Sequence, residues 1–270
     1  MSAYRTVLVE EPEAGITIVR LNRPAVLNAF DSELIRDLEA ALDEELSRPQ
    51  GRVLILTGTG RGFCGGADLR HLDRLLAERR IDEASELVVA GGRIIRALRA
   101  APLPVIAAVN GVAAGGGANL ALACDLRVAS TSARLGQVFN RLGLIPDWGG
   151  TYLLPRLVGE AKALELFWTA ELIGAGELLH LGLVSRVVPE DQLMTATLEL
   201  ARGLLARSPQ SLALTKSACY TSLDKDLWAT LGWEEAHQRK LFNDPEVRAL
   251  VRERLTALSQ KPAEAKPTER

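Results

Sequence analysis

Apolar and polar positions follow two different periods along the chain, and the period changes several times. Short runs of apolar and β-branched residues, bounded by glycine, proline or charged residues, predict strands. These strands are predicted over residues 6–9, 16–21, 52–57, 126–129, 134–136 and 184–188, and a further buried strand starts at Val105.

Longer segments with apolar residues three and four apart predict amphipathic helices. The first follows Asp31 or Ser32, either of which can cap it, and ends near Arg48. Further helices are predicted over residues 69–77, 82–99, 148–156, 160–167, 190–207, 209–221, 226–241 and 245–258. Strands mixed with helices and then helices alone indicate an α/β core with a helical C-terminal subdomain.

This change of pattern divides the chain into three parts. We predict a core over residues 1–200, a helical subdomain over residues 201–258, and a charged, proline-bearing tail over residues 259–270 that is disordered.

Composition narrows the class of protein. The 270 residues, 47% of them hydrophobic, suffice to bury a sizeable core. A formal net charge of −2 without a basic block argues against nucleic acid as a partner. No apolar run reaches the roughly 18 residues of a membrane span, and the N-terminus has no signal-peptide core. Three cysteines without metal-type spacing fit a reduced compartment. We therefore expect a cytoplasmic protein without a metal site.

Three consecutive glycines, Gly115 to Gly117, separate the strand that starts at Val105 from an alanine- and leucine-rich helix. Glycine lets a backbone approach a ligand closely, and the start of a helix presents N–H groups that lack partners. Such a corner can bind an anion, or an oxygen that becomes anionic during a reaction. The glycines can equally serve only to let the helix pack against the strand.

A second glycine loop has the spacing of a dinucleotide-binding motif, with Gly60, Gly62 and Gly65 in G-x-G-x-x-G order. However, these glycines start several residues beyond a strand that is not the first. No acidic residue closes a clean second strand about 20 residues further on. The sequence therefore disfavours a dinucleotide site.

With both glycine loops in view, the sequence resembles the crotonase (enoyl-CoA hydratase/isomerase) family from residue 6 to about residue 255. Four stretches carry the resemblance: Leu-Asn-Arg-Pro and Leu-Asn-Ala at 21–24 and 27–29, Gly-Phe-Cys-Gly-Gly-Ala-Asp-Leu at 62–69, Asn-Gly through the glycine triplet at 110–117, and Gly-Leu-Ile-Pro and Gly-Gly-Thr at 143–146 and 149–151. Each stretch is modest alone, but their order and spacing together are specific.

The resemblance implies a spiral of repeated ββα units, with C-terminal helices that build homotrimers or hexamers. It implies an acyl-CoA substrate, with coenzyme A as part of that substrate and no separate cofactor. By motif position, the two family N–H groups that polarise the thioester carbonyl fall on Ala67 and Gly116. Coenzyme A would lie along Ala25, Val26 and Leu27, and along Asp68 and Leu69 beside Ala67, with Gly115 also in the substrate site.

Two departures from the family pattern bear on the reaction. Family hydratases carry two glutamates, and their positions hold Asn119 and Phe139 here. Neither side chain exchanges a proton near neutral pH, so the usual two-glutamate hydration has no machinery in this chain. Asn119 is either a surface helix residue or a hydrogen-bond partner of the acyl chain. Phe139 and Trp148 either line an apolar acyl pocket or are ordinary core residues.

One carboxylate remains, Asp147, in the pattern Pro-Asp-x-Gly-Gly-Thr at residues 146–151. This pattern resembles the family branch that isomerises double bonds, including the epoxyphenylacetyl-CoA and Δ3,Δ2-enoyl-CoA isomerases, in which an aspartate here is the acid/base. A single carboxylate is chemically sufficient, because it can take a proton from one carbon and return it two carbons along. We therefore predict an isomerase in which Ala67, Gly116 and Asp147 are catalytic.

Three alternatives stay open at this stage. Asp147 directly precedes a helical pattern and is a natural N-cap, which would stabilise its charged form and weaken it as a base. The chain could be a hydratase, or perform other thioester-enolate chemistry, with an unrecognised acid/base. It could also bind acyl-CoA without turnover.

Overall fold

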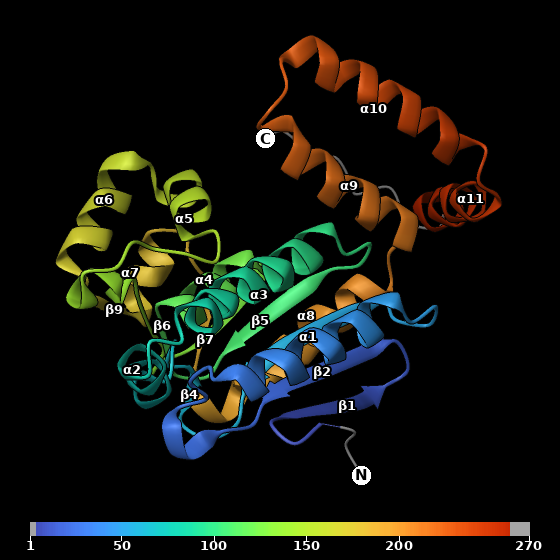
Figure 1. The fold of residues 1–270 in the computed structure, drawn as a ribbon. Helices are drawn as coiled ribbons and strands as arrows, with labels where there is room; N and C mark the ends of the chain where they lie inside the picture. Colours follow the sequence, from blue (N-terminus) through green and yellow to red (C-terminus); the bar gives the residue numbers. More distant parts are fainter. Residues whose placement is uncertain (1–3, 260–270) are drawn as a thin grey trace, which may run out of the picture. The chain divides into compact units, whose positions relative to one another are not determined.

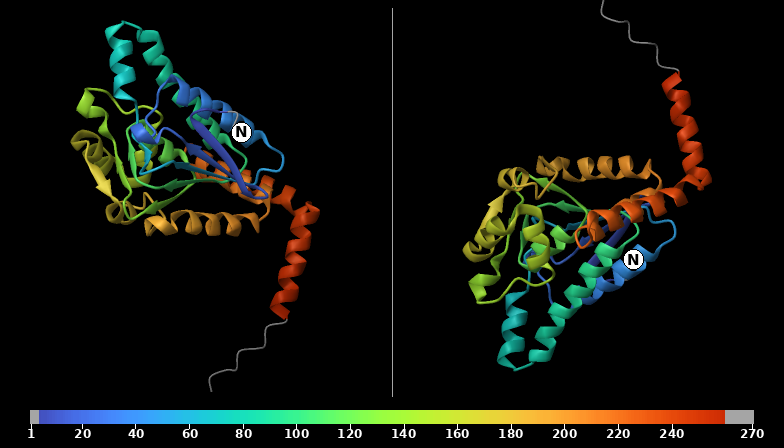
Figure 2. Two further views of the ribbon diagram at one scale, coloured as in Figure 1. Left: turned by 90° about the horizontal axis from the view of Figure 1, so that it is seen from below. Right: turned by 90° about the horizontal axis from the view of Figure 1, so that it is seen from above.

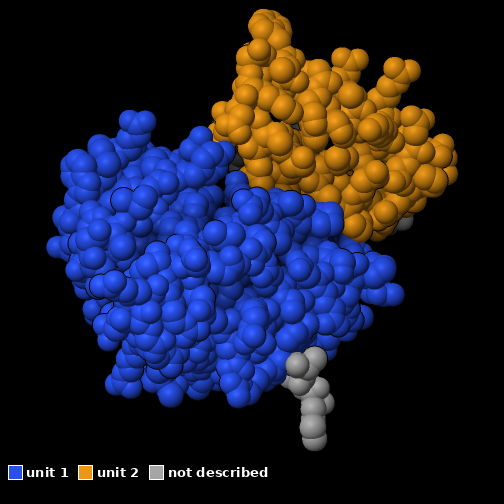
Figure 3. Space-filling view, in the orientation of Figure 1, with its two compact units in different colours: residues 1–207 blue, residues 208–270 orange. Residues whose placement is uncertain are grey.

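A computed structural model describes residues 4–259, and the chain forms two compact units. The first unit spans residues 1–207 and the second spans residues 208–270 (Figure 3). The predicted boundary after residue 200 falls inside helix α8 (Leu193–Leu205), which belongs wholly to the first unit. The core therefore continues to Arg207.

A six-stranded sheet forms the centre of the first unit. Its strands, in spatial order, are β1 (Val7–Glu13), β2 (Ile16–Leu21), β3 (Val53–Gly58), β5 (Val105–Val109), β7 (Leu126–Ser130) and β10 (Arg186–Val188). Only β1 and β2 are antiparallel; every other neighbouring pair is parallel. The strands predicted from apolar runs all lie in this sheet, except the one over residues 134–136.

A second, smaller sheet contains β4 (Gly62–Cys64), β6 (Val112–Ala114), β8 (Arg134–Gly136) and β9 (Leu172–Gly174). The sequence predicted β8 but not β4, β6 or β9. Every strand of this sheet has three residues, so the alternation of apolar and polar positions is a weak signal, and it identified one strand of the four.

The two sheets together reveal the ββα repeat that the family resemblance implies. Strands β3, β5 and β7 lie in the large sheet, and each is followed by one strand of the small sheet, β4, β6 and β8 respectively. After β4 come α2 (Leu69–Ala77) and α3 (Ile81–Ala100), and after β6 comes α4 (Gly116–Ala123). The 3-10 helix η2 (Val138–Leu142), α5 (Gly150–Val158) and α6 (Glu160–Thr169) follow β8. Because the helical part differs in each unit, the repeat is hidden in the sequence.

Helices cover both faces of the large sheet (Figure 1, Figure 2). Helix α1 (Ser32–Ser47) and α3 lie over one face, and α8 lies over the other. Strand β3 is buried at every position: Leu54 and Leu56 face the α1 and α3 layer, whereas Val53 and Ile55 face α8. A strand buried on both faces is apolar at nearly every position, which explains why residues 53–56 form an uninterrupted apolar run.

The predicted cap of α1 is confirmed. The Asp31 carboxylate accepts hydrogen bonds from the backbone N–H groups of Glu33 at 3.1 Å and Leu34 at 2.9 Å. The remaining elements of the first unit are η1 (Pro24–Val26), α7 (Ala175–His180) and η3 (Glu190–Gln192).

The second unit is helical, as predicted. It contains α9 (Pro209–Ser222), α10 (Leu227–Phe242) and α11 (Pro245–Ser259). The predicted disordered tail lies outside the described residues, apart from Ser259, which ends α11. Between residues 4 and 259, no helix combines the length and apolar character needed to cross a bilayer.

Asn28 joins the loop before α1 to the loop between β3 and β4. Its side chain is fully buried, accepts a hydrogen bond from the backbone N–H of Arg23 at 2.8 Å, and donates to the carbonyls of Thr59 at 3.0 Å and Gly62 at 2.8 Å. Asn28 also adopts φ of 56°, a left-handed conformation that asparagine tolerates better than most residues. Both loops are therefore held by one amide.

We expect Asn28→Ala to destabilise the chain by about 3 kcal/mol, because it leaves buried backbone groups unpaired. The measurement is the free energy of unfolding in urea. Asn140→Ala is the control, since Asn140 is exposed and should change stability by less than about 0.5 kcal/mol. Equal urea midpoints for the two variants would contradict the role of Asn28.

Candidate active site

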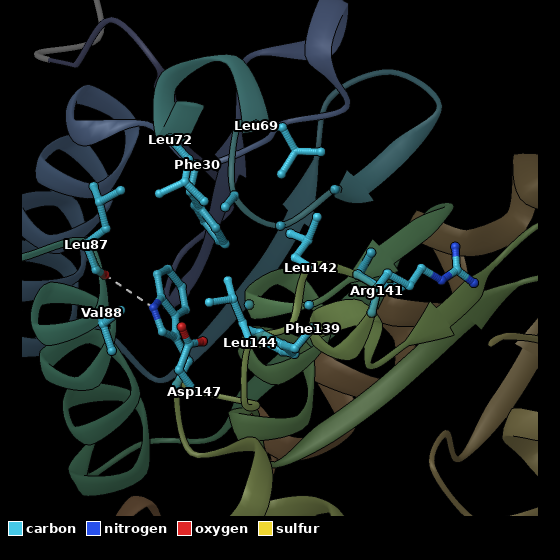
Figure 4. A pocket seen from close by; sticks show the side chains of 18 of the residues that line it. Phe30, Leu69, Leu72, Leu87, Val88, Phe139, Arg141, Leu142, Leu144 and Asp147 are labelled. Carbon is cyan, nitrogen blue, oxygen red and sulfur yellow. Dashed lines mark hydrogen bonds between the residues drawn. The ribbon is translucent and has the colours of Figure 1, made fainter. Parts of the chain in front are cut away.

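A cavity of about 380 Å³ lies between the α2–α3 pair and the segment that runs from η2 to Trp148. Apolar side chains form most of its wall, including Leu69, Leu87, Val88 and Leu144 (Figure 4). The charged side chains among its lining residues are Asp147 and Arg141, and the Arg141 guanidinium points away from the other labelled side chains (Figure 4). The cavity is therefore apolar, with one carboxylate.

Ala67, whose backbone N–H is a predicted donor, lines this cavity. Ala67 forms an isolated parallel bridge with Phe30: Phe30 N donates to Gly66 O at 2.7 Å, and Asp68 N donates to Phe30 O at 2.9 Å. Successive peptide groups of an extended chain point to opposite sides, so the Ala67 N–H points away from Phe30's backbone. No hydrogen bond to it is made within residues 4–259. Ala67 is exposed and lines the cavity.

Gly116, the second predicted donor, also lines this cavity. It is the first residue of α4, so its N–H has no acceptor within the helix. Gly115 precedes it with φ of 53° and ψ of −124°, a conformation essentially restricted to glycine. A Cβ at Gly117 would lie 2.3 Å from Cys64 O, so α4 rests directly on β4. The triplet therefore serves both roles considered from the sequence, an open helix start and close packing.

Asp147 is partly buried and does not cap α5. The N-cap of α5 is Gly149, which makes no side-chain cap bond, so the interpretation of Asp147 as a cap is wrong. The carboxylate instead faces the cavity on the side of Leu144 (Figure 4). Desolvation by burial raises the pKa of Asp147 to about 6, although a hydrogen bond with its own backbone opposes this shift.

The side chain of Trp148, the residue after Asp147, is held by contacts with Leu87 and Phe30. Its indole N–H donates to Leu87 O at 3.3 Å, and its ring lies 4.3 Å from that of Phe30 at an interplanar angle of 36°. A Cβ at Gly91 in α3 would lie only 1.8 Å from the indole, so only glycine accommodates the ring there. A Cβ at Gly116 would lie 3.5 Å from each of the two rings. Both aromatic side chains therefore lie close to the start of α4.

The structure separates the remaining predicted site residues into two groups. Leu69, Gly115, Phe139 and Trp148 line the cavity with Ala67, Gly116 and Asp147, whereas Asn119 does not. Of the two alternatives for Asn119, the surface position is wrong, because its exposure is 0%. Its amide contacts Gln137 and the Asp147 carbonyl.

Of the residues predicted to contact coenzyme A, Leu69 lines the cavity, whereas Ala25, Val26, Leu27 and Asp68 do not. Ala25 and Val26 are exposed on η1, and Leu27 follows with φ of 53°. Asp68 caps α2 through Arg70 N at 3.2 Å and pairs with Arg23 at 3.1 Å. None of these four predicted residues lines the cavity, and their contact with coenzyme A stays a prediction.

Several lining residues were missed from the sequence, notably Phe30, Leu72, Leu87, Val88 and Leu142. In the sequence, those on α2 and α3 are ordinary members of an amphipathic pattern. The usable signal is the width of the apolar stripe on α3, where Val88 remains 45% exposed, more than a single core-facing stripe requires.

Residues 4–259 contain no group of three or more His, Cys, Asp or Glu side chains arranged to hold a metal ion. Cys64 is buried against Asn28 O at 3.1 Å, and burial raises the pKa of its thiol to about 12. That thiol therefore stays protonated and is not a nucleophile.

Comparison with known proteins gives one consistent result. The family model described as enoyl-CoA hydratase/isomerase matches residues 11–261. A short-chain-enoyl-CoA hydratase of Clostridium acetobutylicum is 36% identical, over 84% of this chain and 86% of that protein. A 1,2-epoxyphenylacetyl-CoA isomerase of Escherichia coli is 37% identical, over 86% and 88%. The crystal structure of an enoyl-CoA hydratase from Bacillus anthracis superposes with a TM-score of 0.87 and 32% identity, covering 98% of this chain and 100% of the other.

Asp147→Asn is expected to change how stability depends on pH. The folded carboxyl has a pKa near 6 against an ordinary value of 3.8, so the folded state binds the proton more tightly. Wild-type stability therefore falls as the pH rises from about 4 to about 6, and the asparagine variant lacks this fall. Urea unfolding should show that the variant gains about 2 kcal/mol relative to wild type between pH 4.5 and pH 8. If the difference in unfolding free energy between the variant and wild type does not vary with pH, the Asp147 carboxyl is exposed to water and its pKa is not raised.

Substitutions at two adjacent glycines of α3 form a matched pair that tests where the Trp148 indole packs. Gly91→Ala should cost about 3 kcal/mol, because the indole must leave its position. Gly92→Ala should stabilise by up to about 1 kcal/mol, since its Cβ meets nothing within 4 Å and alanine favours a helix. Thermal unfolding measures both, and a Gly91→Ala variant as stable as Gly92→Ala would show that the indole lies elsewhere.

Proposed function

The chain belongs to the enoyl-CoA hydratase/isomerase family, and from that premise we propose that it moves the double bond of an enoyl-CoA thioester, with Asp147 as the single acid/base. As a member of this family it acts on an acyl-CoA substrate. The observation that carries the proposal is that Asp147 is the only carboxylate among the residues lining the cavity. Asn119 and Phe139 occupy the positions of the hydratase glutamates.

The N–H groups of Ala67 and Gly116 stabilise the thioester oxygen in this proposal. Removing a proton from the carbon next to a thioester moves negative charge onto that oxygen. Fixed donors in an apolar cavity stabilise this charge without reorganising, and one such donor contributes about 3 kcal/mol in other enzymes. The absence of any intramolecular acceptor for either N–H within the described chain supports this role.

Asp147 moves the proton. Its carboxylate takes a proton from C2 of a 3-enoyl-CoA, and the electrons of that C–H bond form a dienolate whose charge rests on the thioester oxygen. The protonated carboxyl then returns the proton to C4, so that the double bond ends between C2 and C3. A group with a pKa near 6 can both accept and donate a proton near neutral pH. The reaction balances without a cofactor.

The cavity wall supports an apolar acyl group. Its leucine and valine side chains offer no hydrogen-bond partners, and Phe30, Phe139 and Trp148 add aromatic faces. The similarity to an isomerase named for a phenylacetyl-CoA derivative agrees with an acyl site that also accepts a ring. Coenzyme A itself is proposed to lie along Ala25, Val26, Leu27, Asp68 and Leu69.

Assembly into a homotrimer or hexamer is part of the same proposal. The helices of the second unit keep large apolar side chains exposed, among them Trp228 at 79%, Phe242 at 63% and Leu255 at 59%. Exposed apolar area of this kind is typical of surfaces that another chain covers.

Hydration is the second candidate. It is favoured by the similarity to proteins named as hydratases, such as that of Clostridium acetobutylicum. Two-group hydration would require a second acid/base residue, because Asp147 is the only carboxylate among the described residues that line the cavity.

Incubation with 2-enoyl-CoA and 3-enoyl-CoA distinguishes these functions. For an isomerase, the 3-enoyl substrate gains the absorbance of a conjugated thioester. Asp147→Asn should lower kcat for this conversion by about 10³-fold, because it removes the proton carrier. Wild-type kcat/KM should rise with pH up to about 6, as the carboxyl ionises. Asp73→Asn, on the exposed face of α2, is the control and should retain full activity.

Other outcomes of the same assay contradict the proposal. Loss of the conjugated absorbance from 2-enoyl-CoA in water indicates a hydratase. Binding without any spectral change indicates an acyl-CoA-binding protein, and undiminished isomerisation by Asp147→Asn removes Asp147 from the mechanism.

A further inference from the structure

Two amide side chains lie side by side behind the wall of the cavity. Asn119 belongs to α4, and Gln137 lies between β8 and η2; their exposures are 0% and 1%. Neither of them lines the cavity. Burying an amide is unfavourable unless it is hydrogen-bonded, so the hydrogen bonds of these two side chains indicate which groups they hold in place.

The direction of these bonds is fixed by chemistry. The Asp147 carbonyl can only accept, so the Asn119 amide turns its Nδ2 toward that oxygen, at 2.8 Å. The Asn119 Oδ1 then faces Gln137, whose Nε2 donates to it at 2.7 Å. The Gln137 Oε1 has no hydrogen-bond partner among the described residues. Gln137 therefore acts on Asn119, and Asn119 acts on Asp147.

Asn119 is one of two donors that hold the Asp147 carbonyl. The other is the backbone N–H of Gly150, also at 2.8 Å. The Asn119 amide rests against Gly150 so closely that a Cβ there would lie 2.5 Å from Nδ2. The Asn119 amide therefore contacts the start of α5 as well as Asp147, and this contact requires a glycine at position 150.

The next residue shows that this turn is constrained. Trp148 has φ of 45°, an unfavourable conformation for a residue with a bulky side chain, which persists only where the surroundings impose it. On one side the indole is held by Leu87 and Gly91, and on the other the Asp147 carbonyl is held by Asn119. The Asp147 carboxylate makes no hydrogen bond to another side chain within the described residues, so its direction depends on its own backbone.

We propose that Asn119, oriented by Gln137, is a positioning residue that holds the Asp147 carboxylate over the cavity without touching the substrate. The inference rests on the proposed role of Asp147 as the acid/base. It also gives a physical reason for an asparagine where family hydratases carry a glutamate. A carboxylate at this place would turn an acceptor toward the Asp147 carbonyl and repel the turn that carries the acid/base.

The test compares Asn119→Leu and Gln137→Met, which keep the approximate shape and remove the polar groups. Asn119→Leu should lower kcat by about 10²-fold and change KM by less than about threefold, because substrate contacts are intact. The acidic limb of the kcat/KM profile should move from about 6 toward the ordinary value of an aspartate, since a loosened carboxylate reaches water.

Gln137→Met covers the case in which Asn119→Leu does not fold. It keeps the bond from Asn119 to the Asp147 carbonyl but removes the group that orients it, so kcat should fall about tenfold with the same movement of the acidic limb. Thr197→Val is the matched control. It removes a buried hydrogen bond within α8, from Thr197 Oγ1 to Leu193 O at 2.7 Å, and should reduce stability without moving the profile.

A double-mutant cycle separates the possible failures. If Asn119 acts through Asp147, Asn119→Leu causes no further loss in the Asp147→Asn background. A further loss there, or an unmoved acidic limb in both the Asn119→Leu and Gln137→Met variants, overturns the positioning role while Asp147 remains the acid/base. Full turnover by Asp147→Asn alone overturns the proposed function instead.

Discussion

Direct contact between backbones at the glycine positions is the constraint on which the cavity depends. A Cβ would lie 2.1 Å from Arg61 O at Gly111, 2.6 Å from Ala114 O at Gly66, and 2.3 Å from Cys64 O at Gly117. At these points the segment after β3, which includes β4, meets the segment after β5, which includes β6 and the start of α4, with no side chain between them. The start of α4 and the chain at Ala67 can therefore approach one cavity, where each leaves an N–H without an intramolecular acceptor. Any larger residue would push the two donors apart.

The second feature is the contrast between these donors and the carboxylate in the same apolar cavity. In the proposed reaction the N–H groups stabilise negative charge on the thioester oxygen, whereas burial disfavours negative charge on Asp147 and raises its pKa to about 6. The proposed isomerisation uses this contrast, because charge moves from the carboxylate to the substrate oxygen and back. Gln137 donates a hydrogen bond to Asn119, and Asn119 donates one to the backbone carbonyl of Asp147. In the positioning proposal, these two amides therefore act on the Asp147 backbone rather than on its carboxylate.

Much of the large sheet and of the helices could be predicted from the sequence, because their signals are local. Asp31 caps α1 as expected, and the apolar run at β3 is buried on both faces. The short strands β4, β6 and β9 were missed, since three residues give only a weak signal, which identified β8 alone in the small sheet. Within the site, the glycine triplet and Asp147 were identifiable by motif. The buried position of Asn119 was not, because only the folded chain brings Gln137 and the turn at Asp147 next to α4. The same holds for Phe30, Leu87 and Val88, whose pattern indicates an amphipathic segment but not the cavity that it borders.

The most direct measurement of the central claim is a crystal structure of the Asp147→Asn variant with a bound 3-enoyl-CoA. We expect the thioester oxygen to lie about 3 Å from the nitrogens of both Ala67 and Gly116, with C2 and C4 of the acyl chain facing the side chain at position 147. A thioester oxygen bound away from either nitrogen, or an acyl chain outside the cavity bordered by Phe30 and Trp148, would contradict it.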